Sequence, residues 1–397
     1  MAFVIQWDPN MKADIIIVGG GIVGSSIAYH LSQLAGAGTV LVLERDHTYT
    51  HAATPLANGG IRRLFSLPEN IQMADFGLSF YQRFSKDMRV EGHSADIGFR
   101  RQGYLFLSDN GGAAQMEENF RMQESMGVPV TLLNPTELSR RFPSVKTTGV
   151  DLAVLSDQDG WIDPHAALMG FRRKAIASGV TYQEAEVIRL EKAGNAVRRA
   201  HDKDGATFEA DVFINASGAW CAELAQTVDL ELPVEPMSRE SYFFRCGEAV
   251  EPLPFIKTET DLAFRPEGQG YVGGVPDWSE KPGWNFSVAP ERFNSVVWPA
   301  LAERIPAMQS LKLERSWRGH YARSVLDYSP ILGPCHGVLD NFFLANGFSG
   351  HGIMHAPAVG MGLAEYVVEG AYQTLGLDCF GYRRILENRP YREKGII

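Results

Sequence analysis

The chain has 397 residues, of which 45% are hydrophobic and 21% are charged, and its formal net charge is −10. This composition is typical of a folded globular protein, and the length favours two or three domains. The acidic balance disfavours nucleic acid as the main partner, because binding to phosphates needs a basic surface.

The sequence indicates neither membrane insertion nor secretion. No apolar run reaches the roughly 18 residues of a membrane span, and residues 1–10 lack the basic and apolar segments of a secretory signal. Met11, directly before the first predicted strand, offers an alternative start. The four cysteines form no CxxC pair, which favours reduced thiols over disulfides or a zinc site. We therefore predict a cytoplasmic protein without a membrane span or a metal site.

The amino-terminal part predicts a βαβ unit. Residues 13–18 form a short apolar run that is typical of a buried parallel strand. Apolar residues then recur at helical spacing across 23–34, and a second apolar strand follows at 39–43.

Between the first strand and this helix, Gly19, Gly21 and Gly24 form a GxGxxG motif. The bare motif is a weak signal, and a second match at 268–273 has no helix after it and is interpreted as a hairpin turn. The first match has the neighbouring elements that dinucleotide binding needs: a strand before it, a helix after it, and a second strand that ends in an acid. The glycines let a pyrophosphate approach the helix N-terminus, and Glu44 can bind a ribose hydroxyl. An acidic residue at that place repels a 2′-phosphate, which disfavours NADP.

The later elements predict a second kind of domain. Asn134 and Asp163 stand where helix N-caps are expected. After about residue 231 short strands alternate with turns, as in an antiparallel sheet, and the pattern later returns to one strand, a glycine turn and a helix. The other predicted helices are 71–84, 113–126, 295–305 and about 358–369, and the other predicted strands are 104–107, those near 187 and 197, 210–215, 242–244, 262–264, 271–272 and 341–345.

Three further glycine-containing turns, at 58–60, 216–218 and 347–352, favour FAD over NAD as the dinucleotide. The first is small enough to wrap a second face of a pyrophosphate. The last precedes a helix, whose N-terminus could stabilise negative charge on a reduced flavin. Each of them alone fits an ordinary turn equally well.

Four segments, DIIIVGGGIVGSSIAYHL, GWIDP, INASGAW and ANGFSGHGI, together resemble the D-amino acid oxidase superfamily of flavoproteins, which includes sarcosine oxidase, glycine oxidase and dimethylglycine dehydrogenase. The likeness covers nearly the whole chain. It is closest to the group of FAD-dependent oxidoreductase-domain-containing proteins, through GGIRRLFSLPENIQ, VWPALAERIPA and SWRGHYARSVLDYSPILGP. It implies an α/β + β fold, in which a Rossmann-type FAD-binding domain (11–86, 145–230 and 325–397) is interleaved with an antiparallel-sheet substrate domain (87–144 and 231–324).

The resemblance also implies that FAD lies extended across the first domain. The binding is expected to be non-covalent, because the SWRGHY segment has no cysteine where sarcosine oxidases attach their flavin. The residues expected to contact FAD are Gly19, Gly21, Ile22, Val23, Gly24, Glu44, Arg45, Asn58, Gly59, Gly60, Val187, Ala216, Gly218, Trp220, Gly319, Gly350, His351, Gly352, Ile353 and Met354.

Two lysines that act in the family's oxidases, one in the reaction with oxygen and one in substrate binding, are replaced in this chain. Tyr271 stands where oxidases carry a lysine that assists the reaction with oxygen, and Met354 stands where a lysine binds the substrate carboxylate. His320 and Tyr321 are the candidates for handling the substrate amine, with a structural hydrogen bond as the alternative. Arg323 could pair with a substrate carboxylate, or it could be a solvated surface residue.

A family arginine in the GGIRRLF loop matches Phe65, and Arg62 lies close to that position. The predicted reaction removes a hydride from the carbon next to the nitrogen of an amino acid or secondary amine, and the resulting imine hydrolyses. The expected partners are this small molecule and either O2 or an electron-acceptor partner. The two alternatives are an FAD-dependent 2-hydroxy acid dehydrogenase and a non-catalytic flavoprotein with a binding or assembly role. The sequence does not identify the substrate, the acceptor or the oligomeric state.

Overall fold

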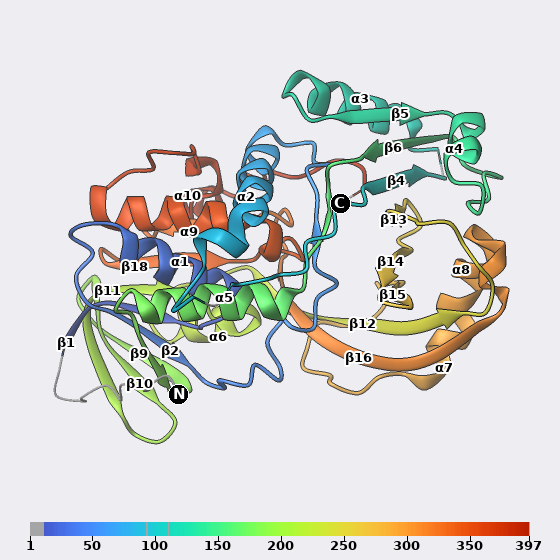
Figure 1. The fold of residues 1–397 in the computed structure, drawn as a ribbon. Helices are drawn as coiled ribbons and strands as arrows, with labels where there is room; N and C mark the ends of the chain where they lie inside the picture. The colour runs from blue at the N-terminus through green and yellow to red at the C-terminus, as the bar shows by residue number, and fades with distance from the viewer. Residues whose placement is uncertain (1–11, 93, 110, 397) are drawn as a thin grey trace.

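The computed structural model describes residues 12–92, 94–109 and 111–396, so the alternative start at Met11 lies outside the described residues. The chain forms two bodies that lie side by side (Figure 1). One is a mixed sheet covered by helices, and the other is a curved sheet whose strands are mostly antiparallel. The predicted α/β + β fold class is confirmed.

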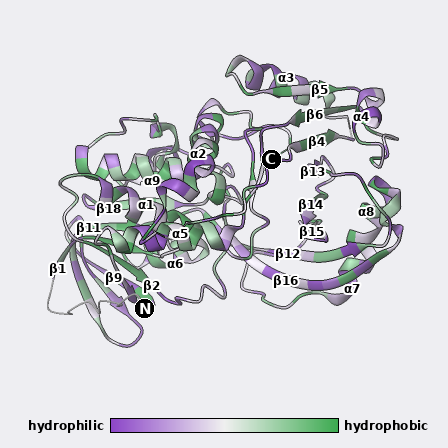
Figure 2. Ribbon diagram, viewed as in Figure 1, coloured by the Kyte–Doolittle hydropathy of each residue, from purple (hydrophilic) through white to green (hydrophobic). Residues whose placement is uncertain are grey.

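The first sheet contains β1 (Lys12–Val18), β2 (Val40–Glu44), β8 (Thr181–Glu184), β9 (Val187–Ala193), β10 (Ala196–Asp202), β11 (Thr207–Asn215), β17 (Ile331–Pro334) and β18 (Phe342–Asn346). Its order is β17-β18-β11-β1-β2-β8, with β9 and β10 attached to β11 as an antiparallel hairpin. β1 is parallel to both β2 and β11, as the predicted βαβ unit requires. β2 and β18 are buried along their whole length, and hydrophobic residues mark this part of the ribbon in Figure 2.

The helices of the first body are α1 (Ile22–Gln33), α2 (Pro68–Asp87), α5 (Pro164–Ala177), α6 (Cys221–Gln226), α9 (Gly352–Glu369) and α10 (Arg383–Leu386). α1 and α9 pack closely, because Gly360 of α9 lies against Ser26 of α1, where a Cβ atom would come within 2.2 Å of the Ser26 hydroxyl. The predicted N-cap at Asp163 is confirmed, since its carboxylate accepts a hydrogen bond from the Ala166 amide at 3.0 Å.

The second sheet has the order β16-β12-β15-β14-β13-β4-β6-β5. Its strands are β4 (Tyr104–Ser108), β5 (Val130–Leu133), β6 (Leu152–Ser156), β12 (Val234–Cys246), β13 (Phe255–Thr258), β14 (Ala263–Glu267), β15 (Gly270–Gly274) and β16 (Leu311–Ser324), and the helices beside it are α3 (Ala113–Ser125), α4 (Pro135–Arg141), α7 (Pro290–Arg292) and α8 (Trp298–Arg304). Asn134 caps α4 in a capping box with Glu137, as its position predicted. A short ladder of β3 (Gly60–Ile61) and β7 (Gly160–Trp161) lies apart from both sheets.

Two details refine the sequence-based boundaries. β6 pairs with β4 and β5 in the second sheet although residues 145–230 are assigned above to the FAD-binding domain. The second GxGxxG match is a hairpin as predicted, because β14 and β15 pair in antiparallel register on either side of Gly268, which has a φ of +55°. The domain division itself stays a prediction.

α9 begins at Gly352, six residues before its predicted start, and continues through Pro357. Proline has no amide hydrogen, so the carbonyl of Ile353, four residues earlier, loses its helical partner. The hydroxyl of Tyr81 on α2 donates a hydrogen bond to this carbonyl at 2.7 Å. α2 comes this close because Gly77 faces α9, where a Cβ atom would lie 2.1 Å from the Met354 carbonyl oxygen. The neighbouring helix thus supplies the bond that allows proline inside α9.

Across the described ranges, no helix is long and apolar enough to cross a membrane.

We expect Tyr81→Phe to lower the free energy of unfolding by about 1–3 kcal/mol, because it leaves the buried Ile353 carbonyl without a donor. Adding Pro357→Ala should recover most of this loss, since alanine restores the amide that bonds to Ile353. Thermal unfolding of the wild type, both single variants and the double variant checks this. A double variant as unstable as Tyr81→Phe would show that the hydroxyl acts elsewhere.

Candidate functional site

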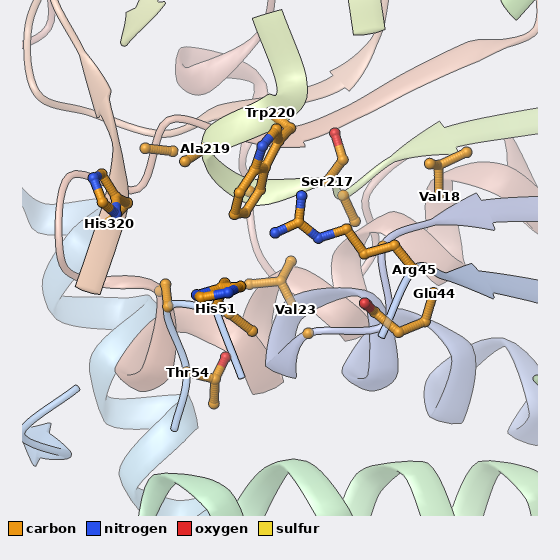
Figure 3. Close-up of a pocket in the computed structure, with 18 of the residues that line it drawn as sticks. Val18, Val23, Glu44, Arg45, His51, Thr54, Ser217, Ala219, Trp220 and His320 are labelled. Carbon is orange, nitrogen blue, oxygen red and sulfur yellow. The ribbon is translucent and has the colours of Figure 1, made fainter. Parts of the chain in front are cut away.

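An elongated cavity of about 390 Å³ opens at the ends of β1, β2 and β11, beside the first turns of α1 and α9. Its far wall is the part of β16 that holds His320, Tyr321 and Ala322. Figure 3 shows Glu44 and Arg45 at one end of the open space and His320 at the other. The predicted contact residues that line it are Gly19, Gly21, Ile22, Val23, Glu44, Arg45, Val187, Ala216, Gly218, Trp220, Gly350, Gly352 and Ile353.

The GxGxxG turn serves two purposes. Gly19 has a φ of +101°, and Gly24 lies so close to it that a Cβ at Gly24 would be 1.9 Å from the Gly19 oxygen, so these glycines hold the helix against the strand. Gly21 is different, because the nearest atom to a Cβ there is the Thr54 hydroxyl at 3.8 Å. The first turn of α1 has no acidic residue and no side-chain cap. The Ile22 amide donates to the Thr54 hydroxyl at 3.2 Å, and the rest of this N-terminus can receive an anion.

Glu44 ends β2 at the cavity wall and is 8% exposed. Its carboxylate accepts hydrogen bonds from the amides of Gly20, at 2.7 Å, and Asp46, at 3.0 Å. Burial raises the pKa of this carboxyl, and the two amide bonds oppose that change. A buried, fixed carboxylate beside the glycine turn fits the predicted role as acceptor for ribose hydroxyls.

Arg45 and Trp220 form the same end of the cavity. The Arg45 guanidinium lies 3.5 Å from the centre of the Trp220 ring, and the other neighbour of that ring is Trp284, stacked at 4.3 Å. Figure 3 shows Trp220 and Arg45 extending toward each other over the open space.

The second helix terminus comes from α9, whose N-cap is His351. Gly350, with a φ of +98°, and Gly352 bring its first turn to the cavity. A cavity that has helix N-termini at two places and a buried acid at one end fits the charge pattern of FAD. α1 would hold the pyrophosphate and Glu44 the ribose, while the start of α9 would face the flavin ring.

His320 lines the cavity but is not a good proton acceptor. Its Nε2 accepts a hydrogen bond from the Asn285 amide at 3.1 Å, so the neutral ring carries its proton on Nδ1, which has no hydrogen-bond partner. Burial and the nearby Arg318 charge lower the pKa of this histidine. His320 is thus a donor in the geometry that the structure gives it. Tyr321, also in the wall, accepts a hydrogen bond from Arg239 at 3.1 Å through its hydroxyl.

Two other catalytic candidates do not line the cavity. Tyr271 packs in the hydrophobic cluster on the outer face of the second sheet, with its ring 6.0 Å from Phe244 and 6.3 Å from Phe264. Because side chains alternate along a strand, the neighbouring Val272, and not Tyr271, points to the other face of this sheet. Arg323 is paired with Glu235 at 2.7 Å. The catalytic roles expected for Tyr271 and Arg323 are therefore corrected to packing and to an ion pair.

The other predicted cofactor residues do not line the cavity. Gly59 and Gly60 pack against Ile162 and Phe255, where a Cβ would come within 2.2 Å and 3.0 Å. The Asn58 carbonyl accepts a hydrogen bond from Arg265 at 2.6 Å. Four predicted residues remain, and each contacts a neighbouring residue. Gly24 packs on Gly19, and Gly319 packs on Leu56. His351 contacts Arg62, and Met354 packs against Gly77.

A basic cluster lies where the second sheet faces the first body. Arg62, 2% exposed, contacts His351 at 3.1 Å between the guanidinium and Nε2, and its charge lies 4.2 Å from the Phe65 ring centre and 5.1 Å from that of Phe106. Throughout the part of the chain that the structure describes, Arg62 forms no ion pair with a carboxylate. Burial and the Arg62 charge hold the pKa of His351 well below its usual range.

Lys257 belongs to the same face of the second sheet. It pairs in register with Phe106 and Ala263, and the next strand places Arg265 on that face, where it reaches Asn58. Burial lowers the pKa of Lys257 to about 7, and the positive charges of Arg62 and Arg239 add to this effect.

Sequence reasoning missed Lys257 and His355. His355 is fully buried beside Phe65, with ring centres 5.2 Å apart, and burial lowers its pKa to about 3. The family's lysine position corresponds to Tyr271 on β15, whereas Lys257 comes from β13. A charged residue inside the apolar strand of residues 255–258 was the available signal.

Comparison with known proteins yields one family and close relatives. The family model described as DAO, FAD dependent oxidoreductase, matches residues 14–366. The chain is 39% identical to FAD-dependent oxidoreductase domain-containing protein 1 of Xenopus laevis, over 98% of this chain and 86% of that protein. It is 27% identical to 4-methylaminobutanoate oxidase (formaldehyde-forming) of Paenarthrobacter nicotinovorans, over 95% of this chain and 46% of that protein. The solved structure of L-proline dehydrogenase from P. horikoshii is similar with a TM-score of 0.85 and 25% identity, covering 96% of this chain and 99% of that one.

We expect Gly21→Ala to weaken FAD binding by about tenfold or more without changing the melting temperature of the apoprotein, because the added methyl group meets the cofactor while its nearest protein atom, the Thr54 hydroxyl, is at an ordinary contact distance of 3.8 Å. Gly376→Ala is the matched control, since nothing lies within 4 Å of its Cβ. Flavin content and fluorescence titration give the affinity. Full FAD affinity in Gly21→Ala would place the pyrophosphate elsewhere.

Proposed function

Because this chain belongs to the DAO family of FAD-dependent oxidoreductases, we propose that it oxidises the carbon–nitrogen bond of an amino acid or a carboxylate-bearing secondary amine. A hydride leaves the carbon next to the nitrogen, and the resulting imine hydrolyses to a carbonyl compound and an amine. Names of the relatives support an amine: one is a 4-methylaminobutanoate oxidase and one is an L-proline dehydrogenase.

The observation that carries the substrate class is the buried guanidinium of Arg62. It lies beside the N-terminus of α9, which lines the cofactor cavity, and its hydrogen-bond partners are the His351 ring, the Leu64 carbonyl and the Tyr104 phenol, all of them neutral. A charge that is buried with only neutral partners is costly. A substrate carboxylate in the bidentate geometry of arginine would offset that cost.

When bound, FAD supplies the acceptor of the hydride. The chain's own residues then have three tasks. Arg62 holds the carboxylate and so orients the substrate, while Phe65 and Phe106 exclude water from that end. Lys257, with a pKa of about 7, is neutral often enough at neutral pH to accept at Nζ the proton that the substrate ammonium must lose. His320 offers its Nδ1–H as a hydrogen-bond donor at the cavity wall.

We expect the purified holoprotein, titrated without oxygen, to lose its flavin absorbance with amino acids or N-methylated amino acids and not with the same amines lacking a carboxylate. Arg62→Met should raise the apparent dissociation constant for the active substrate by about a hundredfold, as removal of a buried charge-assisted bond does. Arg62→Lys should recover only part of the loss, because lysine lacks the planar fork. Reduction by 2-hydroxy acids alone would assign the first alternative function, and no reduction by any compound would favour a non-catalytic role.

A pH profile tests the proton acceptor. Lys257 is protonated below its pKa of about 7 and cannot then take a proton, so the rate of flavin reduction at low substrate should rise as pH increases through about 7. Lys257→Met should lower the rate of flavin reduction and abolish its rise near pH 7. A second rise at higher pH, which comes from deprotonation of the substrate's own ammonium group, should remain. An unchanged limb near pH 7 in Lys257→Met would exclude this residue as the base.

A further inference from the structure

The segment 389–396 connects the two bodies near the Arg62 cluster. The Lys394 amide donates to the Ser66 hydroxyl at 2.8 Å, and the Lys394 carbonyl accepts from Asn119 of α3 at 2.9 Å. Farther along, Gly395 and Ile396 line a small cavity together with Leu64 and Phe106. This segment therefore touches the loop that carries Arg62, as well as the strand and helix of the second body.

Glu393 accepts four hydrogen bonds at this contact. It is 9% exposed, and its two carboxylate oxygens accept hydrogen bonds from four donors: the Ser66 amide at 2.6 Å, the Ser66 hydroxyl, the Leu67 amide at 3.2 Å and the Asn70 side chain at 2.6 Å. Leu67 is the N-cap of α2 and provides no side-chain cap of its own. Glu393 thus supplies the missing cap from the other end of the sequence.

A short path leads from this cap to Arg62. Ser66 follows Phe65, and the Phe65 ring stacks under the Arg62 guanidinium, 4.2 Å away. The same ring touches His351 and His355, both at 5.2 Å between ring centres. Moving Ser66 therefore moves the aromatic surface on which the Arg62 charge rests.

Other anchors hold the same loop on different sides. The carboxylate of Asp159 binds the Arg63 amide at 2.8 Å and its guanidinium at 2.9 Å. Gln123 donates to the Phe65 carbonyl at 3.0 Å. These contacts fix the backbone before Ser66, whereas Ser66 itself is bound by Glu393 and by the Lys394 amide.

We propose that Glu393 is a positioning residue for substrate binding, which acts through Ser66 and Phe65 to hold the Arg62 guanidinium in place for an anionic carboxylate. This inference rests on the proposed function of Arg62.

The test uses benzoate as the probe, because it offers a carboxylate for Arg62 and a ring for the aromatic surface around it. Benzoate is titrated into the FAD-loaded wild type and into Glu393→Gln, Arg62→Met and the double variant, with the flavin absorbance as the signal. A glutamine side chain accepts hydrogen bonds at one oxygen only, so Glu393→Gln loses the hydrogen bonds that the other carboxylate oxygen accepts in the wild type. We expect about tenfold weaker benzoate binding in Glu393→Gln with unchanged FAD content.

The double variant separates positioning from general stability. If Glu393 acts through Arg62, adding Glu393→Gln to Arg62→Met should weaken benzoate binding no further. Glu393→Asp, which keeps the charge, should bind benzoate better than Glu393→Gln and serves as the second variant if the glutamine variant folds poorly. Glu387→Gln is the matched control, because this carboxylate lies near the same segment but forms exposed ion pairs with Arg383 and Arg389.

Two results would overturn this inference but not the proposed role of Arg62. The first is wild-type benzoate affinity in both Glu393→Gln and Glu393→Asp. The second is that Arg62→Met weakens benzoate binding and the double variant weakens it further by the full effect of Glu393→Gln. Unchanged benzoate binding in Arg62→Met would instead overturn the proposed role of Arg62, and the inference with it.

Discussion

The guanidinium of Arg62 and the imidazole of His351, 3.1 Å apart, join the two halves of the site. His351 is the N-cap of α9, whose first turn lines the cofactor cavity, and Arg62 rests on Phe65 and Phe106 at the face of the second sheet. Because burial keeps the histidine neutral, the arginine charge is balanced only through space, by Glu393 and Asp159, and by no ion pair among the described residues. In the function proposed above, the placement of both the cofactor and an anionic substrate depends on this contact.

The surrounding fold keeps that contact rigid. α9 continues through Pro357 because Tyr81 replaces the hydrogen bond that the proline cannot make, and Gly77 lets α2 lie against this helix. The loop that carries Arg62 is held by Asp159, Gln123 and Glu393. These supports come from segments far apart in the sequence, so the site forms only when both bodies are complete.

The cofactor half could be predicted from the sequence, since a GxGxxG turn, two apolar strands and Glu44 follow one another in the chain. The substrate half could not, because its residues meet only through strand pairing and alternation. Tyr271 and Lys257 illustrate this: the tyrosine lies on the expected strand but faces its outer side, while the lysine reaches the inner face from β13. The early start of α9 escaped prediction because Pro357 normally ends a helix, and its compensation comes from another helix.

The most direct measurement of the central claim compares an amino acid that reduces the flavin with its own carboxamide, which differs only in charge at the group that Arg62 is proposed to hold. Anaerobic stopped-flow reduction of the wild type should favour the acid by about a hundredfold in rate over dissociation constant, and Arg62→Met should remove most of this preference. Equal reduction by acid and amide in the wild type would contradict the account.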